Sequence, residues 1–297
     1  MALNYSWPSP AGCSQAPVWT GRGFQVGETL MPILSYEGGA SGWTNELTWF
    51  HEETAGSHHF IDRASRQHAL EQLCKHVRGT SPVILEVGCS SGFMLRLVRE
   101  RFPHALVMGS DVVGEPLAQL AADLPDMPLL QFDLVKCPLP ENSLDAVLLL
   151  NVLEHIQDDA AAMQQIYRIL KPGGIVLIEV PAGPHLYDVY DKLLLHYRRY
   201  SLAALRKLVE EAQLQIAEQS HLGFFLYLGF WLVKQRNKRF LSEKHTVQQQ
   251  IVAQHIRKTN NSRLMDVIMH LELVLGRKIS YPFGIRCLIT CTKVGSE

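Results

Sequence analysis

The feature that most constrains the fold is a regular alternation, from residue 83 onward, between short apolar runs and amphipathic stretches. The apolar runs span residues 83–88, 105–111, 129–133, 145–151 and 174–181. Apolar side chains at spacings of three and four, typical of helices, occupy residues 92–102, 114–124 and 158–170. Continuous apolar strands separated by helices predict a parallel sheet covered on both faces. The chain is therefore expected to contain a doubly wound α/β domain.

The segments before this alternation are less regular. Residues 1–43 are rich in Gly, Pro and Ser and lack periodicity, so they are expected to form an irregular arm. Two short helices should follow, over residues 44–53 and 62–77, and Asp62 could cap the second. Residues 1–78 are thus interpreted as an N-terminal arm with a helical cap.

The order of elements changes after residue 181. A helix is expected over residues 200–213 with Ser201 as its cap, followed by a strand over residues 214–222 and a last strand over residues 284–294. Two further helices, over residues 247–256 and 264–275, separate these two strands. The main domain should therefore span residues 79–297, with a helical insertion at about 223–280 that could form a lid beside the site.

Composition excludes several classes of partner. Among 297 residues the formal net charge is −1, so no overall field attracts nucleic acid, and no nucleic-acid partner is expected. The six cysteines are scattered without a C-x-x-C pair, as in a reduced cytosolic protein. The first thirty residues lack a basic start followed by an apolar core, so no secretory signal is expected. The predicted location is the cytoplasm.

One apolar run, Leu222 to Val233, precedes the basic residues 234–239. It is too short to span a bilayer, which requires about 20 helical residues. It could contact a membrane peripherally or grip a lipidic substrate. A buried strand end followed by a core-facing helix is the favoured alternative.

Candidate ligand-binding residues follow the carboxyl ends of the predicted strands, where open parallel sheets bind their ligands. They are Glu86, Gly88 and Gly92 after the first strand, then Asp111, Asp133 and residues 151–155 after the next three. The first loop lacks the G-x-G-x-x-G spacing of a dinucleotide fingerprint, and the Glu86 carboxylate would repel a pyrophosphate. The loop therefore favours a positively charged ligand over a nicotinamide dinucleotide.

These residues resemble the first motif of class I S-adenosylmethionine-dependent methyltransferases, an acidic residue followed by glycines at alternate positions. Glu86, Gly88 and Gly92 match this motif, while Ser90 replaces the middle glycine. A serine is tolerated there if its φ stays below zero. Later motifs of the superfamily are similar to residues 151–156 and 170–174. A bacterial subgroup with a His-Tyr-Arg-Arg-Tyr run is similar over residues 196–201 and 281–284.

The resemblance implies a Rossmann-like, doubly wound sheet of seven strands whose last strand is antiparallel. It implies S-adenosylmethionine as the cofactor and S-adenosylhomocysteine as the product. Asp111 would bind both ribose hydroxyls, and Asp133 would lie by the adenine amine beside the backbone N–H of Leu134. The rest of the implied cofactor site consists of Cys89, Ser90, Val112, Asn151 and Leu153. The sulfonium and ammonium groups of this cofactor suit a carboxylate at Glu86, and one carboxylate matches paired hydroxyls.

Residues for the methyl acceptor are less specific. His155 and His196 are candidate general bases, since imidazole accepts a proton near neutral pH. Tyr197, Arg198 and Arg199 could clamp a carboxylate or phosphate of the substrate. The equally weighted alternative is a structural ion-pair cluster that involves Asp188, Asp191 or Glu210.

The N-terminal residues 50–66 are rich in His, Asp and Glu, but their spacing matches no metal motif, so no metal is expected. Instead, this segment should fold across the cofactor or acceptor pocket, with His59 contacting the substrate.

The function predicted from these patterns is methylation of a small molecule. The expected reaction is O-methylation of a natural product, a lipid-linked intermediate or a saccharide. The alternatives are N- or C-methylation of a metabolite, or a non-catalytic regulatory protein that binds S-adenosylmethionine.

Overall fold

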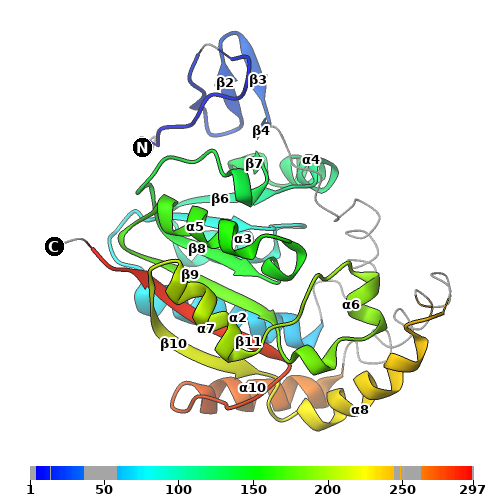
Figure 1. Cartoon of the computed structure of the whole chain (residues 1–297). Coiled ribbons are helices and arrows are strands. Elements are labelled where there is room, and N and C mark those ends of the chain that lie inside the picture. The colour runs from blue at the N-terminus through cyan, green and yellow to red at the C-terminus, as the bar shows by residue number, and fades with distance from the viewer. Residues whose placement is uncertain are drawn as a thin grey trace.

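An eight-stranded sheet between two layers of helices organises the molecule (Figure 1). The computed structural model describes residues 5–13, 15–36, 59–243, 248, 250 and 262–295. The strands of the main sheet are β4 (Ile33–Ser35), β5 (Val83–Val87), β6 (Leu106–Asp111), β7 (Leu129–Gln131), β8 (Leu144–Leu150), β9 (Leu170–Pro181), β10 (Leu214–Leu222) and β11 (Arg286–Lys293).

The strand order is β10-β11-β9-β8-β5-β6-β7-β4. Strands β9, β8, β5, β6, β7 and β4 run parallel, whereas β11 is antiparallel to both of its neighbours. The predicted doubly wound α/β fold with an antiparallel last strand is therefore confirmed. The sheet has eight strands instead of seven, because β4 from the N-terminal region pairs with β7 at the edge.

Helices cover both faces of the sheet because each presents an apolar stripe to it. Helices α2 (Phe60–His76), α3 (Phe93–Arg101) and α4 (Gly114–Asp123) pack on one face. Helices α5 (Asp159–Ile169) and α7 (Leu202–Glu211) pack on the other. Ile84 and Val147, which belong to adjacent strands, are fully buried on opposite faces, as a sheet covered on both sides requires.

The expected helices outside the central domain have different outcomes. His59, not Asp62, is the N-cap residue of α2, and Asp62 lies in its first turn. The helix expected over residues 44–53 lies outside the described residues, and so does most of the one over residues 247–256. Helix α10 (Arg263–Gly276) matches the one expected over residues 264–275.

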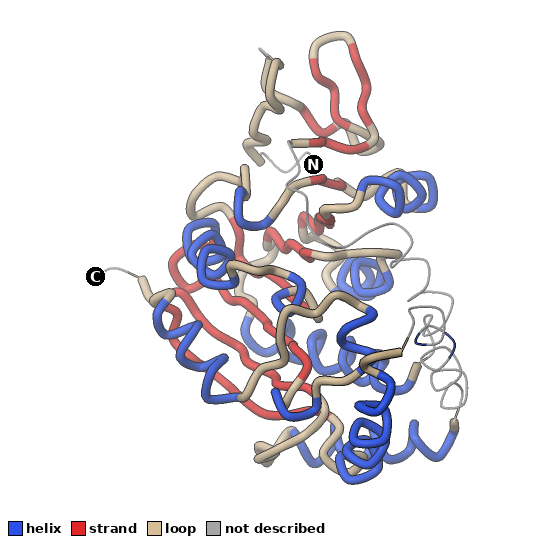
Figure 2. The backbone as a smooth tube through the Cα atoms, turned by 45° about the vertical axis from the view of Figure 1, so that its right-hand side comes forward, coloured by secondary structure: helices blue, strands red, loops and turns tan. Residues whose placement is uncertain are grey.

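The described part of residues 1–43 is more ordered than an irregular arm. Strands β1 (Val18–Trp19), β2 (Phe24–Val26) and β3 (Thr29–Met31) form a small antiparallel sheet that projects from the edge of the body (Figures 1 and 2). The Phe24 ring packs edge-on against Trp7, with 4.9 Å between ring centroids. Both rings belong to the same buried cluster as the strands of the main sheet. Strands this short leave little periodicity in the sequence, which explains why pattern analysis missed them.

The segment between β10 and β11 contains α8 (Tyr227–Asn237) and α10. Leu222 is a buried strand end, as expected, and Phe230 of the helix that follows packs against a buried cluster. Leu228 and Leu232 on α8 are instead 74% and 62% exposed. The favoured interpretation of a core-facing helix is therefore correct for only one side of α8, which also carries the buried polar side chains of Lys234 and Asn237.

No helix in the described ranges combines the length and apolar character needed to cross a membrane.

The remaining elements are short. They are α6 (Val189–Leu193) and the 3₁₀ helices η1 (Leu134–Lys136), η2 (Leu153–His155), η3 (Pro184–Leu186) and η4 (Lys238–Phe240). Of these, η1 and η2 directly follow β7 and β8 and therefore lie at the carboxyl edge of the sheet, where the candidate site is expected.

The packing of the N-terminal sheet predicts that Phe24→Ala lowers the free energy of unfolding by about 3–5 kcal/mol, because a fully buried aromatic ring is lost. Urea unfolding followed by circular dichroism measures the change. Leu30→Ala is the matched control on the same small sheet, since Leu30 is 55% exposed, and it should change stability by less than about 0.5 kcal/mol. Equal effects of the two substitutions would show that this sheet is not part of the folded core.

Candidate functional site

The loop after β5 brings the backbone very close to neighbouring elements. Gly88 and Gly92 have φ of 72° and 71°, in the left-handed region that favours glycine. A Cβ atom on Gly88 would lie 2.7 Å from Val152 Cγ2, in the loop after β8. A Cβ atom on Gly92 would lie 2.7 Å from Leu120 Cδ1 on α4. Both glycines are thus required by the backbone conformation and by close packing.

Ser90 does not meet the condition under which a serine was judged tolerable in this loop. Its φ is +44° and not below zero. A non-glycine residue in this region costs of order 1–3 kcal/mol unless its surroundings hold it there. The Ser90 N–H donates to Asp111 Oδ2 at 3.1 Å, which helps to hold it. Ser90 therefore adopts a left-handed conformation that glycine adopts more readily.

Glu86 is buried near the end of β5, between β6 and β8. Burial raises the pKa of Glu86 well above its usual value; nearby Arg66 opposes this rise and Asp111 adds to it. Its Oε2 atom accepts no hydrogen bond within the described part of the chain. A buried carboxylate oxygen without a donor favours a cationic ligand. This chemistry fits the ammonium group of S-adenosylmethionine.

Asp111 ends β6 with its carboxylate turned toward the glycine loop. Besides the Ser90 bond, Asp111 Oδ1 accepts from the Val113 N–H at 3.1 Å. These bonds tie the ends of β5 and β6 together. The neighbouring Val112 is half-buried, and its carbonyl accepts from Gln131 Nε2 at 3.2 Å.

Asp133 is the N-cap residue of η1. Its Oδ1 atom accepts from the Val135 N–H at 3.0 Å at the start of η1. The side chain of the following Leu134 is buried in the core. A capping carboxylate keeps a second oxygen, so the cap does not conflict with an adenine contact.

Asn151 and Leu153 follow β8. Asn151 has φ of +57°, and its Nδ2 atom donates to Glu179 Oε1 at 3.2 Å. The side chain of Leu153 is fully buried, and its carbonyl accepts from the Tyr200 hydroxyl at 3.2 Å. Leu153 can therefore offer a cofactor only its backbone. Cys89 is also packed away, and burial raises the pKa of its thiol well above the usual value.

A network around Glu179 was not expected from the sequence. This buried residue near the end of β9 accepts from Ser65 at 2.7 Å and forms an ion pair with Arg286. Arg286 also pairs with Asp62 of α2. Burial alone would lower the pKa of Arg286, but the attraction of Glu179 and Asp62 outweighs burial and raises this pKa above its usual value. The guanidinium therefore stays charged. Nothing in the spacing of these residues signals that they meet, because they come from three distant segments.

The two candidate bases lie together. The rings of His155 and His196 are 4.6 Å apart between centroids and nearly perpendicular. Burial lowers the pKa of His196, although Asp191, whose Oδ1 is 2.9 Å from His196 Nδ1, raises it. Burial also raises the pKa of the adjacent Glu154 to about 8. The structure thus creates one cluster from residues some forty positions apart.

Arg199 is not placed to clamp a substrate. It is buried, its Nη1 atom donates to Asp191 at 2.9 and 3.1 Å, and its Nε atom donates to the Ala182 carbonyl. The alternative of a structural ion-pair cluster with Asp191 is therefore correct for Arg199.

Arg198 and Tyr197 lie nearer the surface. Arg198 pairs with Asp159 at 2.6 Å and also bonds to the Gln157 carbonyl. The ring of Tyr197 is half exposed, and its N–H donates to the Glu154 carbonyl at 2.8 Å. Arg198 is therefore already paired, as Arg199 is. Among Tyr197, Arg198 and Arg199, Tyr197 is the residue with an exposed side chain.

Lys234 completes the buried ion-pair cluster. Its Nζ atom lies 2.6 Å from Asp188 and 3.0 Å from Asp191, and all three side chains are buried. Lys234 belongs to the basic segment that follows the apolar run, yet it is inaccessible to nucleic acid or lipid. It instead fastens α8 to the elements beside the site.

His59 lies at the start of α2, 3.8 Å from Asp62 and stacked on Phe60. Its role as a substrate contact stays a prediction.

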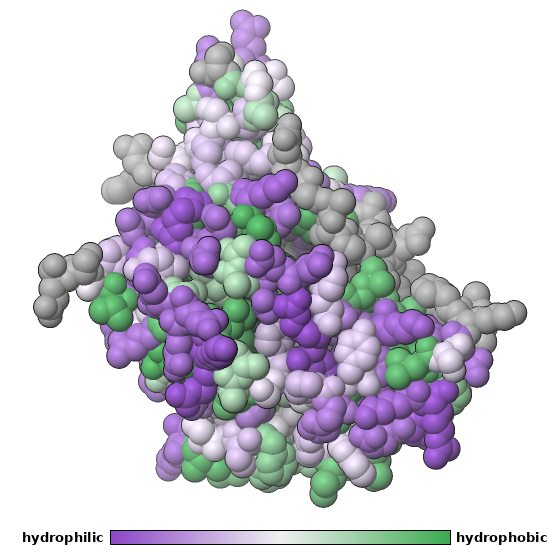
Figure 3. All heavy atoms as spheres, viewed as in Figure 1, coloured by the Kyte–Doolittle hydropathy of each residue, from purple (hydrophilic) through white to green (hydrophobic). Residues whose placement is uncertain are grey.

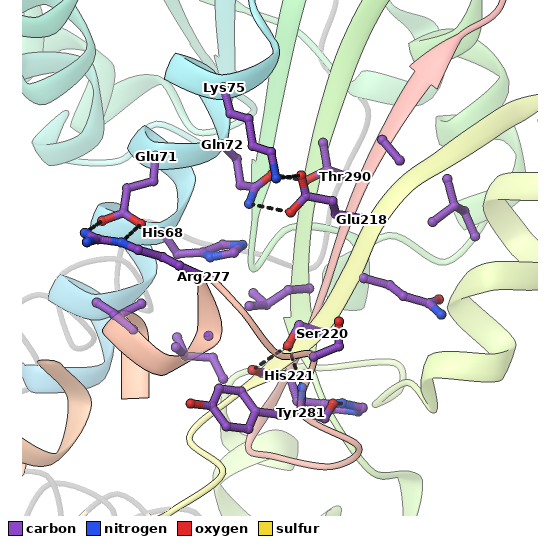
Figure 4. A pocket seen from close by; sticks show the side chains of 18 of the residues that line it. His68, Glu71, Gln72, Lys75, Glu218, Ser220, His221, Arg277, Tyr281 and Thr290 are labelled. Carbon is purple, nitrogen blue, oxygen red and sulfur yellow. Dashed lines mark hydrogen bonds and ion pairs between the residues drawn. The ribbon is translucent and has the colours of Figure 1, made fainter. Parts of the chain in front are cut away.

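A separate cavity of about 650 Å³ lies between α2, β10 and α10 (Figure 4). Its charged side chains are already paired, Glu71 with Arg277 and Glu218 with Lys75. It contains none of the predicted cofactor or acceptor residues.

The ion-pair cluster predicts that Lys234→Met lowers the free energy of unfolding by about 3–5 kcal/mol, because buried Asp188 loses its cation and buried Asp191 keeps only Arg199. Lys207→Met is the matched control, since Lys207 is exposed and pairs only across one helical turn, and it should cost less than about 0.5 kcal/mol. Thermal and urea unfolding of both variants measures the difference. A stable Lys234→Met protein would mean that the two aspartates do not depend on this lysine.

Residues 85–178 match the model of the family described as a methyltransferase domain. This range runs from β5 to β9 and contains the glycine loop, Asp111, Asp133 and Glu154. The matched region therefore contains the predicted cofactor residues, whereas His196 and Arg199 lie beyond it.

Several curated relatives share this region. A Mycolicibacterium smegmatis protein named as an S-adenosylmethionine-dependent methyltransferase is 30% identical over 144 residues, 48% of this chain and 54% of the relative. Cycloartenol-C-24-methyltransferase of Arabidopsis thaliana is 33% identical over 141 residues, 42% of each chain. Trans-aconitate 2-methyltransferase of Azoarcus sp. is 29% identical, over 41% of this chain and 47% of the relative. The chain spans about half the length of these relatives.

Solved structures share the fold over most of the chain. Phosphoethanolamine N-methyltransferase 2 of Haemonchus contortus has a TM-score of 0.57 at 17% identity, and the match covers 86% of this chain and 59% of that one. The cyclase SpnF has a TM-score of 0.54 at 18% identity, over 84% and 93% of the two chains. A fold that is shared by a methyltransferase and a cyclase does not define a reaction. The family match is more specific, and it shows that residues 85–178 are similar to a methyltransferase domain.

Proposed function

We propose that this protein transfers a methyl group from S-adenosylmethionine to a hydroxyl oxygen of a small molecule. The observation that carries the proposal is the pair of carboxylates, Glu86 and Asp111, that ends two adjacent strands on either side of the glycine loop. The loop glycines expose backbone to a ligand, and the carboxylates provide acceptors for an ammonium group and for hydroxyls.

Each implied cofactor residue has a distinct task. Glu86 accepts the ammonium group, and Gly88 and Gly92 let the methionine part approach the backbone. Asp111 accepts from the ribose hydroxyls. Asp133, with the backbone of Leu134, lies on the adenine side, and Val112 borders the nucleoside. The bound cofactor supplies a methyl group that its sulfonium has already activated.

Transfer to oxygen forms a carbon–oxygen bond as the carbon–sulfur bond breaks, and the bonding pair leaves with sulfur. The hydroxyl proton must be removed from the acceptor side. His155 of η2 and His196 from the segment after α6 lie together, and the carboxylate of Asp191 holds the His196 ring in place. This arrangement supports an oxygen acceptor, because an amine that is already neutral needs no such group.

A lipid-linked acceptor is supported by the surface of the insertion. Exposed apolar side chains cluster on α8 and α10; they are Leu228, Trp231, Leu232, Leu264, Val267 and Leu271. Apolar patches are visible along the lower rim of the molecule, where both helices lie (Figure 3). Patches of this kind mark sites of contact with a partner or a lipid. His59 and Tyr197 would contact the polar part of the acceptor.

Calorimetry with S-adenosylhomocysteine tests the cofactor site. We expect the wild type to bind, and Asp111→Ala to bind at least about tenfold more weakly, because charge-assisted hydrogen bonds are worth about 1.5–3 kcal/mol each. Asp111→Asn keeps the shape of the side chain and reports the loss of charge alone. Asp123→Ala, an exposed carboxylate on α4, is the control. A wild type that does not bind, or an Asp111→Ala variant with undiminished affinity, contradicts the proposal.

Vesicle sedimentation tests the lipid contact through Leu222–Val233. The full-length protein should sediment with vesicles of phosphatidylcholine and phosphatidylglycerol. Leu228→Ser together with Leu232→Ser should weaken this at least about tenfold, since burying each leucine contributes roughly 1.5–3 kcal/mol. Leu30→Ser removes a leucine that is 55% exposed at the far end of the molecule and should have no effect. Sedimentation that the double substitution leaves unchanged would refute a role of α8.

A further inference from the structure

Three potential metal ligands converge after β8. Glu154, His155 and His196 each direct one ligand atom into a common space, and these atoms lie within 4.8 Å of one another. Glu154 and His155 belong to η2, whereas His196 comes from the segment after α6. The Tyr197 N–H donates to the Glu154 carbonyl at 2.8 Å, so backbone pairing fixes the two segments relative to each other.

Glu154 has a buried carboxylate that no neighbouring donor of the described residues satisfies. Its side chain is fully buried, and neither carboxylate oxygen accepts a hydrogen bond within the described residues. Buried carboxylates in folded proteins are paired, hydrogen-bonded or bound to metal, because removal from water is otherwise costly. Glu154 therefore indicates a ligand that carries positive charge.

The neighbouring cations are engaged elsewhere. Lys234 pairs with Asp188 and Asp191, and Arg199 pairs with Asp191. Arg286 pairs with Asp62 and Glu179. In the described part of the chain, no ion pair joins Glu154 to a lysine or arginine, so a bound cation is a suitable partner for its carboxylate.

His196 is oriented as a metal ligand is. Its Nδ1 atom faces Asp191 Oδ1 at 2.9 Å, so Nε2 is the ring nitrogen left to bind. Asp191 is in turn fixed by Arg199 and Lys234. A carboxylate that holds the second nitrogen of a histidine fixes the tautomer and raises the basicity of the nitrogen that binds the metal.

We propose that Glu154, His155 and His196 bind a divalent transition-metal ion such as Zn²⁺. Two imidazoles and one carboxylate suit Zn²⁺ and its neighbours in the first transition row better than Mg²⁺ or Ca²⁺, which prefer oxygen ligands. Three protein ligands leave at least one coordination position open, as in catalytic zinc sites. The ligand atoms lie within 4.8 Å of one another, so the most distant pair needs to approach by about 1.5 Å to match the spacing of about 3.3 Å in a tetrahedral site.

The position of the ion suggests its task. Val152, directly before η2, touches the glycine loop, since a Cβ atom on Gly88 would lie 2.7 Å from Val152 Cγ2. The open position could therefore hold the acceptor hydroxyl and lower its pKa, with the histidines as ligands rather than as bases. This task rests on the O-methylation proposed above, whereas metal binding itself does not.

Cobalt spectroscopy tests the site without an activity assay. The metal-stripped, full-length protein is titrated with Co²⁺, whose visible d–d absorption reports its ligands. One equivalent should produce intense bands in the wild type, and Zn²⁺ should abolish them by displacement. Glu154→Gln and His196→Gln should each weaken Co²⁺ binding at least about tenfold. His104→Gln, which removes an exposed histidine after α3, should bind as the wild type does.

Bands that are absent from the wild type, or equally strong in the Glu154 and His196 variants, overturn the proposal. Thermal unfolding and S-adenosylhomocysteine binding of each variant show whether the fold is intact. If a variant is unfolded, X-ray absorption at the zinc edge of the wild type decides, because a coordination shell without two imidazoles rules the site out. Cofactor binding without metal binding removes this proposal alone, and metal binding without cofactor binding removes the proposed function alone.

Discussion

The structure depends on one constraint: the parallel strands at the centre of the sheet are buried on both faces. Helices α2, α3 and α4 occupy one side, and α5 and α7 the other. A side chain that needs a polar ligand therefore has access to it only where a strand ends. This is why Glu86, Asp111, Asn151 and Glu179 all lie along the same edge, although they are spread over almost a hundred residues. The antiparallel strand β11 adds Arg286 to that edge from the far end of the chain.

Buried charge connects the site to the rest of the molecule. Asp191 contacts His196, Arg199 and Lys234, which come from two segments more than thirty residues apart. The attraction of Lys234 and Arg199 for Asp191 outweighs its burial, which by itself would raise the pKa, so the pKa of Asp191 is well below its usual value. The charged carboxylate can then fix His196 while Lys234 holds α8. The helix that carries the exposed apolar surface is therefore fastened to the same aspartate that orients a candidate catalytic histidine.

The sequence predicted the strands that carry the site because their apolar runs are continuous and their spacing is regular. It also placed Gly88, Gly92 and Asp111 correctly at the ends of β5 and β6, since a residue's position at a strand end follows from the pattern alone. It missed β1 to β4, whose strands of two or three residues are too short for periodicity to register. It could not distinguish the packed side of α8 from the exposed one, because an apolar run looks the same whether it faces a core or the outside.

The sequence alone determined the class of fold and the positions of the seven expected strands along the chain. It also determined the acidic and glycine positions that mark the cofactor loop. These properties are local, since each depends on residues within one strand and the turn that follows it. Only the tertiary structure decided the ion-pair roles of Arg199, Lys234 and Glu179 and the burial of Glu154. The groups within a few ångströms of a charged side chain decide whether it can bind a substrate, form an ion pair or accept a cation. Those neighbours come from distant segments, and only folding brings them together.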